Sequence, residues 1–585
     1  MMFKVITGWF PYIHASATSR CYVLWGREPS QSWGTIWYHI RNAKKEGKKL
    51  IVVDPRHTQS ASLADIHLQL RPGTDCALAL AMINVIIDDN LYDKEFVTHY
   101  CHGFDQLRQR VQQYAPEKVS EITWIPADKI REAARMYATN KPGAIIDGMG
   151  VEHLENNAEY IHARLALAAI VGNISVPGGE ALYGPHPKAI SVNEIELVDM
   201  LPGEQRQKVL GADRFKVSTS TGYDLIQENL IRVWGKRGGR SMAECAANAP
   251  LVYRSIITGE PYQVKALITL NSNPMVTQAN TKLVYKALKN LDLYVVVDFV
   301  MTPSAELADY VLAGACWMER PCIFDGGNNA NYLFGGEQAL PTMVADEYDH
   351  RDDYQFWREL GIRLGQKEYW WESMEDVFDY RLKPMELTFA EFMAKGGIDR
   401  PPVDFDFYKT KGFATPSGKV ELYSTILEKL GYDPLPAYRE PAESPISQPS
   451  LAEKYPYILI TGSRHQPFFH SEFRHVYSLR KRHHDPLVQI HPQTARDLQI
   501  ENGDWVWIET IRGRVRQRCQ YYDGLQPAVV NAQHGWWFPE LPGEEPWLHG
   551  VWESNINVCT NDDPEVCNPL LGSWPLRTFL CKIHK

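Results

Sequence analysis

Two stretches, IVVDPRHTQSASLADIHL at residues 51–68 and VVVDFVMTPSAELADYVL at residues 295–312, follow one pattern. Each begins with β-branched residues that end at an aspartate, and then reads D-x3-T-x5-A-D-x2-L. The shared positions are Asp54, Thr58, Ala64, Asp65 and Leu68 in the first stretch, and Asp298, Thr302, Ala308, Asp309 and Leu312 in the second. Five identities at equal offsets indicate an internal duplication. The alternative is two unrelated β-α-β units that share only strand-end chemistry.

The residues before each aspartate support the duplication. In the first copy, a strand at residues 21–25, a loop at 26–30 and a helix at 33–46 precede a strand at 49–53. The second copy has a strand at 264–270, a loop at 271–275, a helix at 281–290 and a strand at 293–297. Strand–loop–helix–strand units place parallel strands beside each other through right-handed crossovers. Ligands in such sheets bind at the carboxyl ends of the strands, where both loops and both aspartates fall.

The strand ends predict nucleotide chemistry. Loop N–H groups can hold a phosphate, and a carboxylate can accept hydrogen bonds from ribose hydroxyls. A third strand at residues 144–146 enters a glycine loop that begins at Gly148, and Thr74 and Asp75 open an apolar helix as its N-cap and first turn. Neither copy contains G-x-G-x-x-G, which argues against an ordinary NAD site. The duplication therefore predicts two nucleotide sites, or one ligand with two nucleotide arms.

Composition excludes several functional classes. The 585 residues carry a formal net charge of −10, which disfavours binding to nucleic acid or to an anionic membrane. The longest apolar run, residues 77–87, is too short to span a bilayer. No export signal precedes the first strand, and no C-x-x-C occurs among the ten cysteines.

The C-terminal part changes character after a Pro-rich stretch at residues 434–449. Short strands at 457–460, 488–490, 505–510, 513–520 and 528–530, with a helix at 493–498, predict a compact β-barrel. We expect three domains at residues 1–255, 256–444 and 445–585. The histidine and tryptophans at residues 534–537 either line a cleft or form a buried aromatic cluster.

The motifs together resemble the prokaryotic molybdopterin-containing oxidoreductases, the dimethyl sulfoxide reductase family, and within it the acetylene hydratase-like subgroup. The segments that carry the family resemblance are VLWGREPSQSWG, the two duplicated stretches, the segment ending VGNISVPGG, LNSNPM, TPSGKVELYS and LITGSRHQPFFHSEFR. The tail HGVWESNINVCTNDDPEVCNPLLGSWPLR carries the similarity to the subgroup. The resemblance implies an α/β fold with two pseudo-symmetric Rossmann-like parallel-sheet domains and a C-terminal β-barrel of the double-psi type. It also implies a molybdenum or tungsten bis(molybdopterin guanine dinucleotide) cofactor.

The resemblance assigns cofactor-binding positions residue by residue. One dinucleotide is expected at Gly26, Arg27, Glu28, Asp54, Arg56, Thr58, Thr74, Asp75 and Gly148. The other is expected at Asn271, Asn273, Pro274, Asp298 and Thr302. Barrel positions expected to close over the pterins are Gly462, Arg464, His465, Asn531 and Asn555. Arg27, Arg56, Arg71 and Arg464 are suitable counter-charges for the pyrophosphates.

The chain departs from the family at its front. The family's cysteine motif for a [4Fe–4S] cluster and its metal-ligating Ser, Cys or selenocysteine precede the strand at residues 21–25, and neither is present. Our hypothesis is that the given reading frame starts downstream of a selenocysteine stop codon, and the alternatives are a split gene or a real truncation. No metal-ligating or catalytic residue is assigned. Cys21 is expected to be a core residue, and His483-His484, in a basic run, a solvated surface.

The leading function is therefore the catalytic subunit, or its C-terminal bulk, of an enzyme for oxygen-atom and two-electron transfer or for hydration and hydroxyl transfer. Its expected partners are a small-molecule substrate and an iron–sulfur electron-transfer subunit, without nucleic acid or a membrane span, in the cytoplasm. The alternatives are a non-catalytic cofactor-binding or accessory chain, and an ordinary two-site dehydrogenase.

Overall fold

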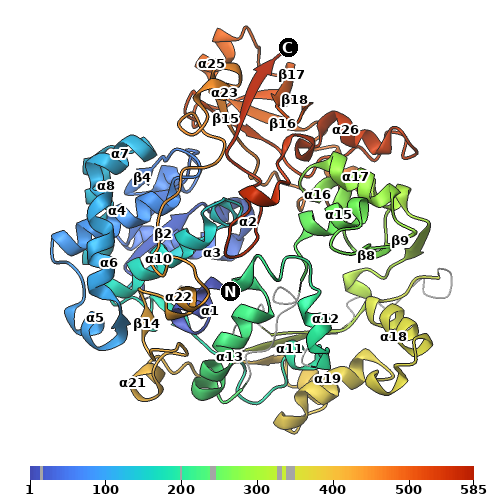
Figure 1. The fold of residues 1–585 in the computed structure, drawn as a ribbon, viewed down its shortest axis with the longest axis horizontal. Coiled ribbons are helices and arrows are strands. Elements are labelled where there is room, and N and C mark those ends of the chain that lie inside the picture. The colour runs from blue at the N-terminus through green and yellow to red at the C-terminus, as the bar shows by residue number, and fades with distance from the viewer. Residues whose placement is uncertain (14–17, 198–199, 237–245, 326–331, 338–348) are drawn as a thin grey trace.

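The computed structural model describes residues 1–13, 18–197, 200–236, 246–325, 332–337 and 349–585. Figure 1 shows two groups of strands and helices, blue on one side and green on the other, below a barrel drawn in orange to red. The mixed α/β class with a closed C-terminal barrel is confirmed. The three domain boundaries remain predictions.

The first unit is a sheet of four parallel strands in the order β4-β3-β2-β6. The strands are β2 (Cys21–Trp25), β3 (Lys49–Val53), β4 (Ile66–Leu68) and β6 (Gly143–Asp147). Helix α3 (Gly34–Lys45) packs on one face, where its Ile36 and Ile40 meet Leu50 of β3. The other face lies against α4 (Asp75–Asp88), α8 (Ala127–Thr139) and α10 (Asn157–Ile170). All five β2 residues are buried because both faces are covered.

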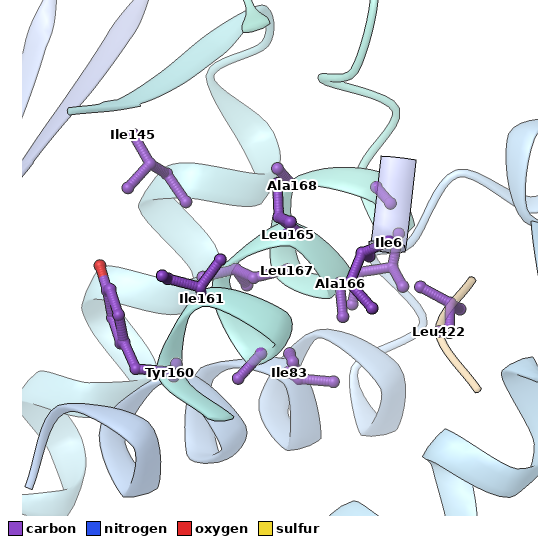
Figure 2. Close-up of a cluster of buried hydrophobic side chains, with 14 of the residues drawn as sticks. Ile6, Ile83, Ile145, Tyr160, Ile161, Leu165, Ala166, Leu167, Ala168 and Leu422 are labelled. Atoms are coloured by element: carbon purple, nitrogen blue, oxygen red, sulfur yellow. The ribbon is translucent and has the colours of Figure 1, made fainter. Parts of the chain in front are cut away.

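The main core lies under this second face. Figure 2 shows apolar side chains of α10, among them Ile161 and Leu165, packed with Ile83 of α4 and Ile145 of β6. Ile6 of α1 (Met2–Thr7) joins the same cluster. Cys21 is fully buried on the sheet and burial raises its pKa to about 12, which confirms a core cysteine.

The second unit repeats the order of the first. Its three parallel strands are β8 (Ala266–Leu270), β9 (Leu293–Asp298) and β10 (Tyr310–Ala313), in the order β10-β9-β8. Helix α17 (Thr281–Lys289) occupies the place of α3, and the short helices α2 (Pro29–Ser32) and α16 (Pro274–Thr277) correspond. The predicted strands and helices thus match the observed ones to within two residues.

The repeated motif has a structural cause in both copies. The amide of Leu50 donates to Asp65 Oδ2 and the amide of Tyr294 donates to Asp309 Oδ2, each at 2.7 Å. Thr58 and Thr302 each accept a hydrogen bond from the amide three residues later, at 3.3 Å. The shared Thr and the second Asp therefore fix the turn between two strands in each copy.

The barrel closes six strands in the order β15-β19-β16-β18-β17-β20. They are β15 (Tyr457–Ile460), β16 (Leu487–Ile490), β17 (Trp505–Thr510), β18 (Gly513–Tyr521), β19 (Val529–Ala532) and β20 (Phe579–His584), with α25 (Pro492–Asp497) after β16. Five of these strands were predicted. The sixth, β20, pairs with both β15 and β17 and closes the ring.

Smaller elements connect the units. β1 (Pro11–Ile13) pairs with β7 (Glu180–Leu182), β5 (Cys101–His102) with β14 (Val420–Glu421), and β11 (Cys322–Phe324), β12 (Leu333–Gly336) and β13 (Ile398–Asp399) form a third small sheet. The longer connecting helices are α6 (Phe104–Val111), α7 (Pro116–Thr123), α13 (Ser220–Trp234), α15 (Ala249–Thr258), α18 (Asp353–Arg363) and α19 (Met374–Leu382). In the described ranges no helix is both long and apolar enough to cross a membrane.

We predict that Asp65→Ala and Asp309→Ala each destabilise the protein by about 1–3 kcal/mol, because each leaves a buried backbone N–H without an acceptor. The check is thermal unfolding together with amide exchange at Leu50 and Tyr294. The matched Asn variants keep an acceptor oxygen and should lose much less. Equal stability of the Ala and Asn variants would show that neither side chain holds its strand.

Candidate functional site

A cavity of about 540 Å³ lies where the carboxyl ends of β2, β3 and β6 meet the barrel. This volume is typical of ligand sites in proteins. The cavity brings together twelve of the predicted positions: Gly26, Arg27, Glu28, Asp54, Arg56, Thr58, Asp75, Gly148, Gly462, Arg464, His465 and Asn531. Residues more than 400 positions apart in the sequence thus share one wall.

Glycines allow two strand-end loops to touch at the floor of the cavity. Gly26 has a φ of 58°, and its N–H donates to Val53 O. A Cβ on Gly148 or Gly150 would lie 2.2 or 2.6 Å from the carbonyl oxygen of Gly26. The glycines are therefore required because the two backbones approach each other too closely to leave room for a Cβ atom.

Arginines give the cavity a positive lining with unused donors. Arg27 donates from Nη1 to Asp147 O at 3.0 Å, and its guanidinium stacks on Trp33. Arg56 stacks on Tyr522 in the same way. In the described part of the chain, the buried Nε atoms of Arg27, Arg56 and Arg577 have no hydrogen-bond partner. Buried unpaired donors on charged groups are costly, so this wall is suited to an anionic ligand.

Three carboxylates face the same space. Glu28 accepts hydrogen bonds from the amides of Ser30 and Ser60 and from Ser60 Oγ, and these bonds outweigh burial and lower its pKa. Asp54 is 9% exposed, and burial raises its pKa to about 6 although Arg56 acts against the shift. Burial likewise raises the pKa of Asp75 to about 6, while Trp25 Nε1 donates to Asp75 Oδ1 at 2.8 Å.

A hydrogen-bonded chain of side chains runs behind the cavity wall. Arg464 Nη2 lies 3.0 Å from His470 Nε2, and His470 Nδ1 lies 2.9 Å from His534 Nε2. Because arginine can only donate, we assign the proton of His470 to Nδ1 and that of His534 to Nδ1. Burial and neighbouring arginines lower the pKa of both imidazoles. Both rings are therefore neutral donors at pH 7.

Some predicted groups are engaged elsewhere. Thr74 occupies the N-cap of α4 as expected, but its hydroxyl donates to Arg71 O instead of capping the helix. Arg71 is not a free counter-charge, because it forms a bidentate ion pair with Glu440 at 2.6 and 2.8 Å. His483 is not a solvated residue: its ring stacks on His465 and bonds to Gln533.

The aromatic alternative holds for residues 536–537. Trp536 and Trp537 are buried, and Trp536 lies between the guanidinium groups of Arg474 and Arg480. Arg474 is 1% exposed and donates to the backbone carbonyl oxygens of His470, His534 and Gly535. It holds the loops that present the histidine chain.

The second set of predicted residues lies at the carboxyl ends of β8 and β9, outside this cavity. Asn271 has a φ of 48° and its side chain approaches Asp353, while Thr302 caps the turn described above. Asn273 Oδ1 accepts from Ser304 Oγ, its neighbour Pro274 begins α16, and its own Nδ2 is a buried donor without a described partner. Burial raises the pKa of Asp298 to about 6, and Glu472 of the barrel adds to the shift.

Asn555 links the second unit to the barrel. Its Nδ2 donates to Met275 O and Thr281 Oγ1, each at 3.1 Å, and the residue is fully buried. Its amide is thus used for tertiary structure rather than facing the cavity. Asn531 does face the cavity, and its Oδ1 has no partner among the described residues.

Sequence reasoning missed Arg577, which lines the cavity opposite Gly462. A Cβ on Gly462 would lie 1.5 Å from Arg577 Nη1, so only glycine leaves room for this guanidinium. Burial lowers the pKa of Arg577 to about 10 despite Asp54, Asp75 and Glu152 nearby. The preceding SWPL carries no motif, and only the closure of the barrel by β20 brings Arg577 here.

Family comparisons fit this arrangement. A molybdopterin oxidoreductase model matches residues 13–363, and a molybdopterin dinucleotide-binding domain model matches residues 457–569. The chain belongs to the molybdopterin oxidoreductase family. It is an enzyme of that family, and the predicted resemblance is confirmed.

Individual relatives refine the comparison. Acetylene hydratase of Syntrophotalea acetylenica is 39% identical over 574 residues, which cover 97% of this chain and 78% of the relative. Formate dehydrogenase H of Escherichia coli is 28% identical and covers 88% of this chain and 68% of the relative. The solved acetylene hydratase from Pelobacter acetylenicus superposes with a TM-score of 0.95 at 37% identity, covering all of this chain and 80% of the solved one.

The residues of the cavity fit a molybdopterin cofactor. The guanidinium groups of Arg27, Arg56 and Arg577 suit the phosphate oxygens of such a group, and the carboxylates of Asp54 and Asp75 can accept from ribose or base donors. In the described segments no three His, Cys, Asp or Glu side chains are grouped to hold a metal ion.

We predict that Asp54→Asn stabilises the cofactor-free protein at pH 8 by about 3 kcal/mol. Because folding raises the pKa of Asp54 from 3.8 to about 6, its carboxylate destabilises the folded state above pH 6, and this cost disappears as the pH falls toward 3.8. The thermal midpoint of the variant should exceed that of the native chain at pH 8 and approach it at pH 5.

The matched control is Asp213→Asn, at an exposed position, which should leave the midpoint unchanged at every pH. A difference for Asp54→Asn that grows as the pH falls would contradict the assignment of a raised pKa.

Proposed function

We propose that this chain is the catalytic subunit, or the C-terminal bulk of one, of a molybdenum or tungsten enzyme that holds bis(molybdopterin guanine dinucleotide). The observation that carries the proposal is the cavity between the first sheet and the barrel, which is lined by the arginines Arg27, Arg56 and Arg577. The match to a dinucleotide-binding domain over residues 457–569 supports the same ligand.

The two arms of the ligand are assigned to the two units. The first unit supplies Arg27, Arg56 and Asp54 to one guanine dinucleotide, and Arg464, His465 and Arg577 of the barrel close on it. The second unit supplies Asn271, Asn273 and Asp298 to the other. The unpaired Nδ2 of Asn273 supports this assignment, because it lacks an acceptor among the described residues.

The finer architecture belongs to the same proposal. The matching order of elements in the two units supports two pseudo-symmetric Rossmann-like domains. This order is β2, α3, β3 and β4 in the first unit and β8, α17, β9 and β10 in the second. The mixture of parallel and antiparallel pairs in the closed barrel supports a double-psi type. We place the domains at residues 1–255, 256–444 and 445–585.

The reaction we propose is a hydration of the acetylene hydratase type, because that relative covers 97% of the chain at 39% identity. When bound, the cofactor supplies a Lewis-acidic metal whose oxidation state can also change by two. This chain's residues bind and orient it. Arg464 donates to His470 Nε2 and His470 Nδ1 donates to His534 Nε2, so the two neutral imidazoles hold Arg464 in place and add no positive charge.

Two-electron transfer is the second candidate, because formate dehydrogenases are also among the relatives. One of them is named as a subunit alpha. For a redox reaction we propose an iron–sulfur electron-transfer subunit as the partner of this chain. A non-catalytic accessory chain is the remaining alternative.

The testing experiment is analysis of metal and guanine nucleotide in the protein purified from a host that makes the cofactor. Two guanine nucleotides per molybdenum or tungsten are expected. A ratio of one would refute the two-arm assignment, and protein without metal or nucleotide would favour the accessory chain. Assays of acetylene hydration and of formate oxidation on the same preparation separate the two reactions.

We predict that Arg577→Gln lowers the bound guanine nucleotide at least tenfold, because it removes the charge that lies against Gly462 and Asp54. The measurement is nucleotide released on denaturation, together with calorimetric titration of the cofactor-free protein with GDP. Arg514→Gln, which changes an exposed arginine on the outside of the barrel, is the control and should bind as the native chain does. Equal loss in both variants would remove Arg577 from the site.

A further inference from the structure

Two histidines of the first unit face each other beside the cavity without lining it. His57 lies in the loop after β3, and His67 is the central residue of β4, the edge strand of the first sheet. Their Nδ1 atoms are 3.3 Å apart, and the two rings meet edge to face with centroids 5.2 Å apart. His57 is exposed and His67 is half-buried. The site described above uses neither side chain.

The separation of the two nitrogens matches the spacing of two ligands on one metal ion. Zinc binds imidazole nitrogen at about 2.0–2.1 Å in tetrahedral geometry, so two coordinated nitrogens lie about 3.3–3.4 Å apart. The same distance is long for a hydrogen bond, whose donor and acceptor usually lie within about 3.2 Å. The backbone of the first unit therefore holds the two rings at the spacing that a metal ion requires.

The partner of His67 leaves its Nδ1 free to bind. His67 Nε2 lies 3.0 Å from the carbonyl oxygen of Asp54, which can only accept. We therefore assign the proton of His67 to Nε2 and a lone pair to Nδ1. A histidine that binds a metal normally donates its other ring N–H to a carbonyl or carboxylate, which orients the ring and strengthens it as a ligand. His67 already has this arrangement.

Ser62 allows His57 to take the same form. Ser62 Oγ lies 3.2 Å from His57 Nε2 and 3.2 Å from the carbonyl oxygen of Thr58. If the hydroxyl donates to Thr58 O, its oxygen accepts from His57 Nε2, and His57 Nδ1 carries a lone pair. If it donates to His57 Nε2, the proton is on His57 Nδ1 and faces His67. Rotation of one hydroxyl thus prepares both rings as ligands, and neither ring has to move.

We propose that His57 and His67 bind a zinc-like divalent ion through their two Nδ1 atoms, with water in the remaining positions. Imidazole suits zinc, copper and nickel, whereas magnesium and calcium prefer oxygen ligands. In the described segments no three His, Cys, Asp or Glu side chains are grouped, and the exposure of His57 leaves the other positions open to water. This inference does not depend on the cofactor or on the reaction.

The location gives the ion a structural effect. His57 N–H donates to Gly524 O at 2.7 Å, and Tyr522 Oη donates to His57 O at 2.6 Å, so this loop residue is held to the barrel through its own backbone. His67 belongs to the first sheet. An ion between the two rings therefore ties the loop that contacts the barrel to the sheet beneath it.

The test is calorimetric titration of the chain, without a histidine tag and dialysed against a chelator, with zinc chloride. His57→Gln and His67→Gln should each weaken the binding of one zinc ion at least tenfold. Glutamine keeps an amide donor for the carbonyl of Asp54, so thermal unfolding without zinc should change little. Magnesium chloride in place of zinc should give no binding.

Matched controls are two other exposed histidines of the first unit. His39→Gln in α3 and His99→Gln in α5 (Lys94–Tyr100) should bind zinc as the native chain does. Absence of zinc binding to the native chain overturns the proposal. Undiminished binding in both His57→Gln and His67→Gln also overturns it, because the ion would then lie elsewhere.

A second measurement uses the native chain and does not depend on how the variants fold. Diethyl pyrocarbonate modifies accessible imidazoles, and mass spectrometry locates the modified residues. Zinc should slow modification of His57 and His67 at least tenfold and leave His99 unaffected. Equal modification of His57 with and without zinc would contradict the site.

Discussion

The contact between two backbone loops, at Gly26 and at Gly148–Gly150, is the constraint on which the site depends. Parallel strands bring β2 and β6 to the same edge, and the absence of Cβ atoms lets their loops touch there. Arg27 and Met149 consequently diverge into the cavity from a shared floor. Any side chain at these glycines would separate the loops and enlarge the site before it altered any ligand contact.

The electrostatics of the cavity follow from this close contact between the two loops. Four arginines border the cavity and the nearby imidazoles stay neutral, since burial and positive neighbours lower their pKa, to about 3 for His465. Two aspartates are held at raised pKa values in the same space. The four guanidinium groups thus share the cavity with the carboxylates of Glu28, Asp54 and Asp75, so the wall offers both cationic donors and anionic acceptors to a ligand.

Local patterns in the sequence were sufficient for much of the fold. The strands β2, β3, β9 and β17 follow from short apolar runs bounded by turn residues, and the duplication follows from identities at equal offsets. The first half of the site followed too, because carboxyl ends of parallel strands must share an edge.

What the sequence could not supply depends on long-range contact. β20 closes the barrel from the far end of the chain and carries Arg577 into the site with it. Arg71 finds Glu440 across 369 positions, so its charge is already matched.

The seam between the first unit and the barrel has a consequence for loading. His57 N–H donates to Gly524 O, Tyr522 Oη to His57 O, Gln69 Nε2 to Gly524 O, and Gln526 Nε2 to Gln69 O. These four hydrogen bonds form a row that joins the first unit to the barrel beside the cavity. A large ligand entering from that side would require these hydrogen bonds to break one after another and to re-form once it had passed, while both sheets stay intact. Faster amide exchange at His57 than at Val52 would report this local opening of the hydrogen bonds.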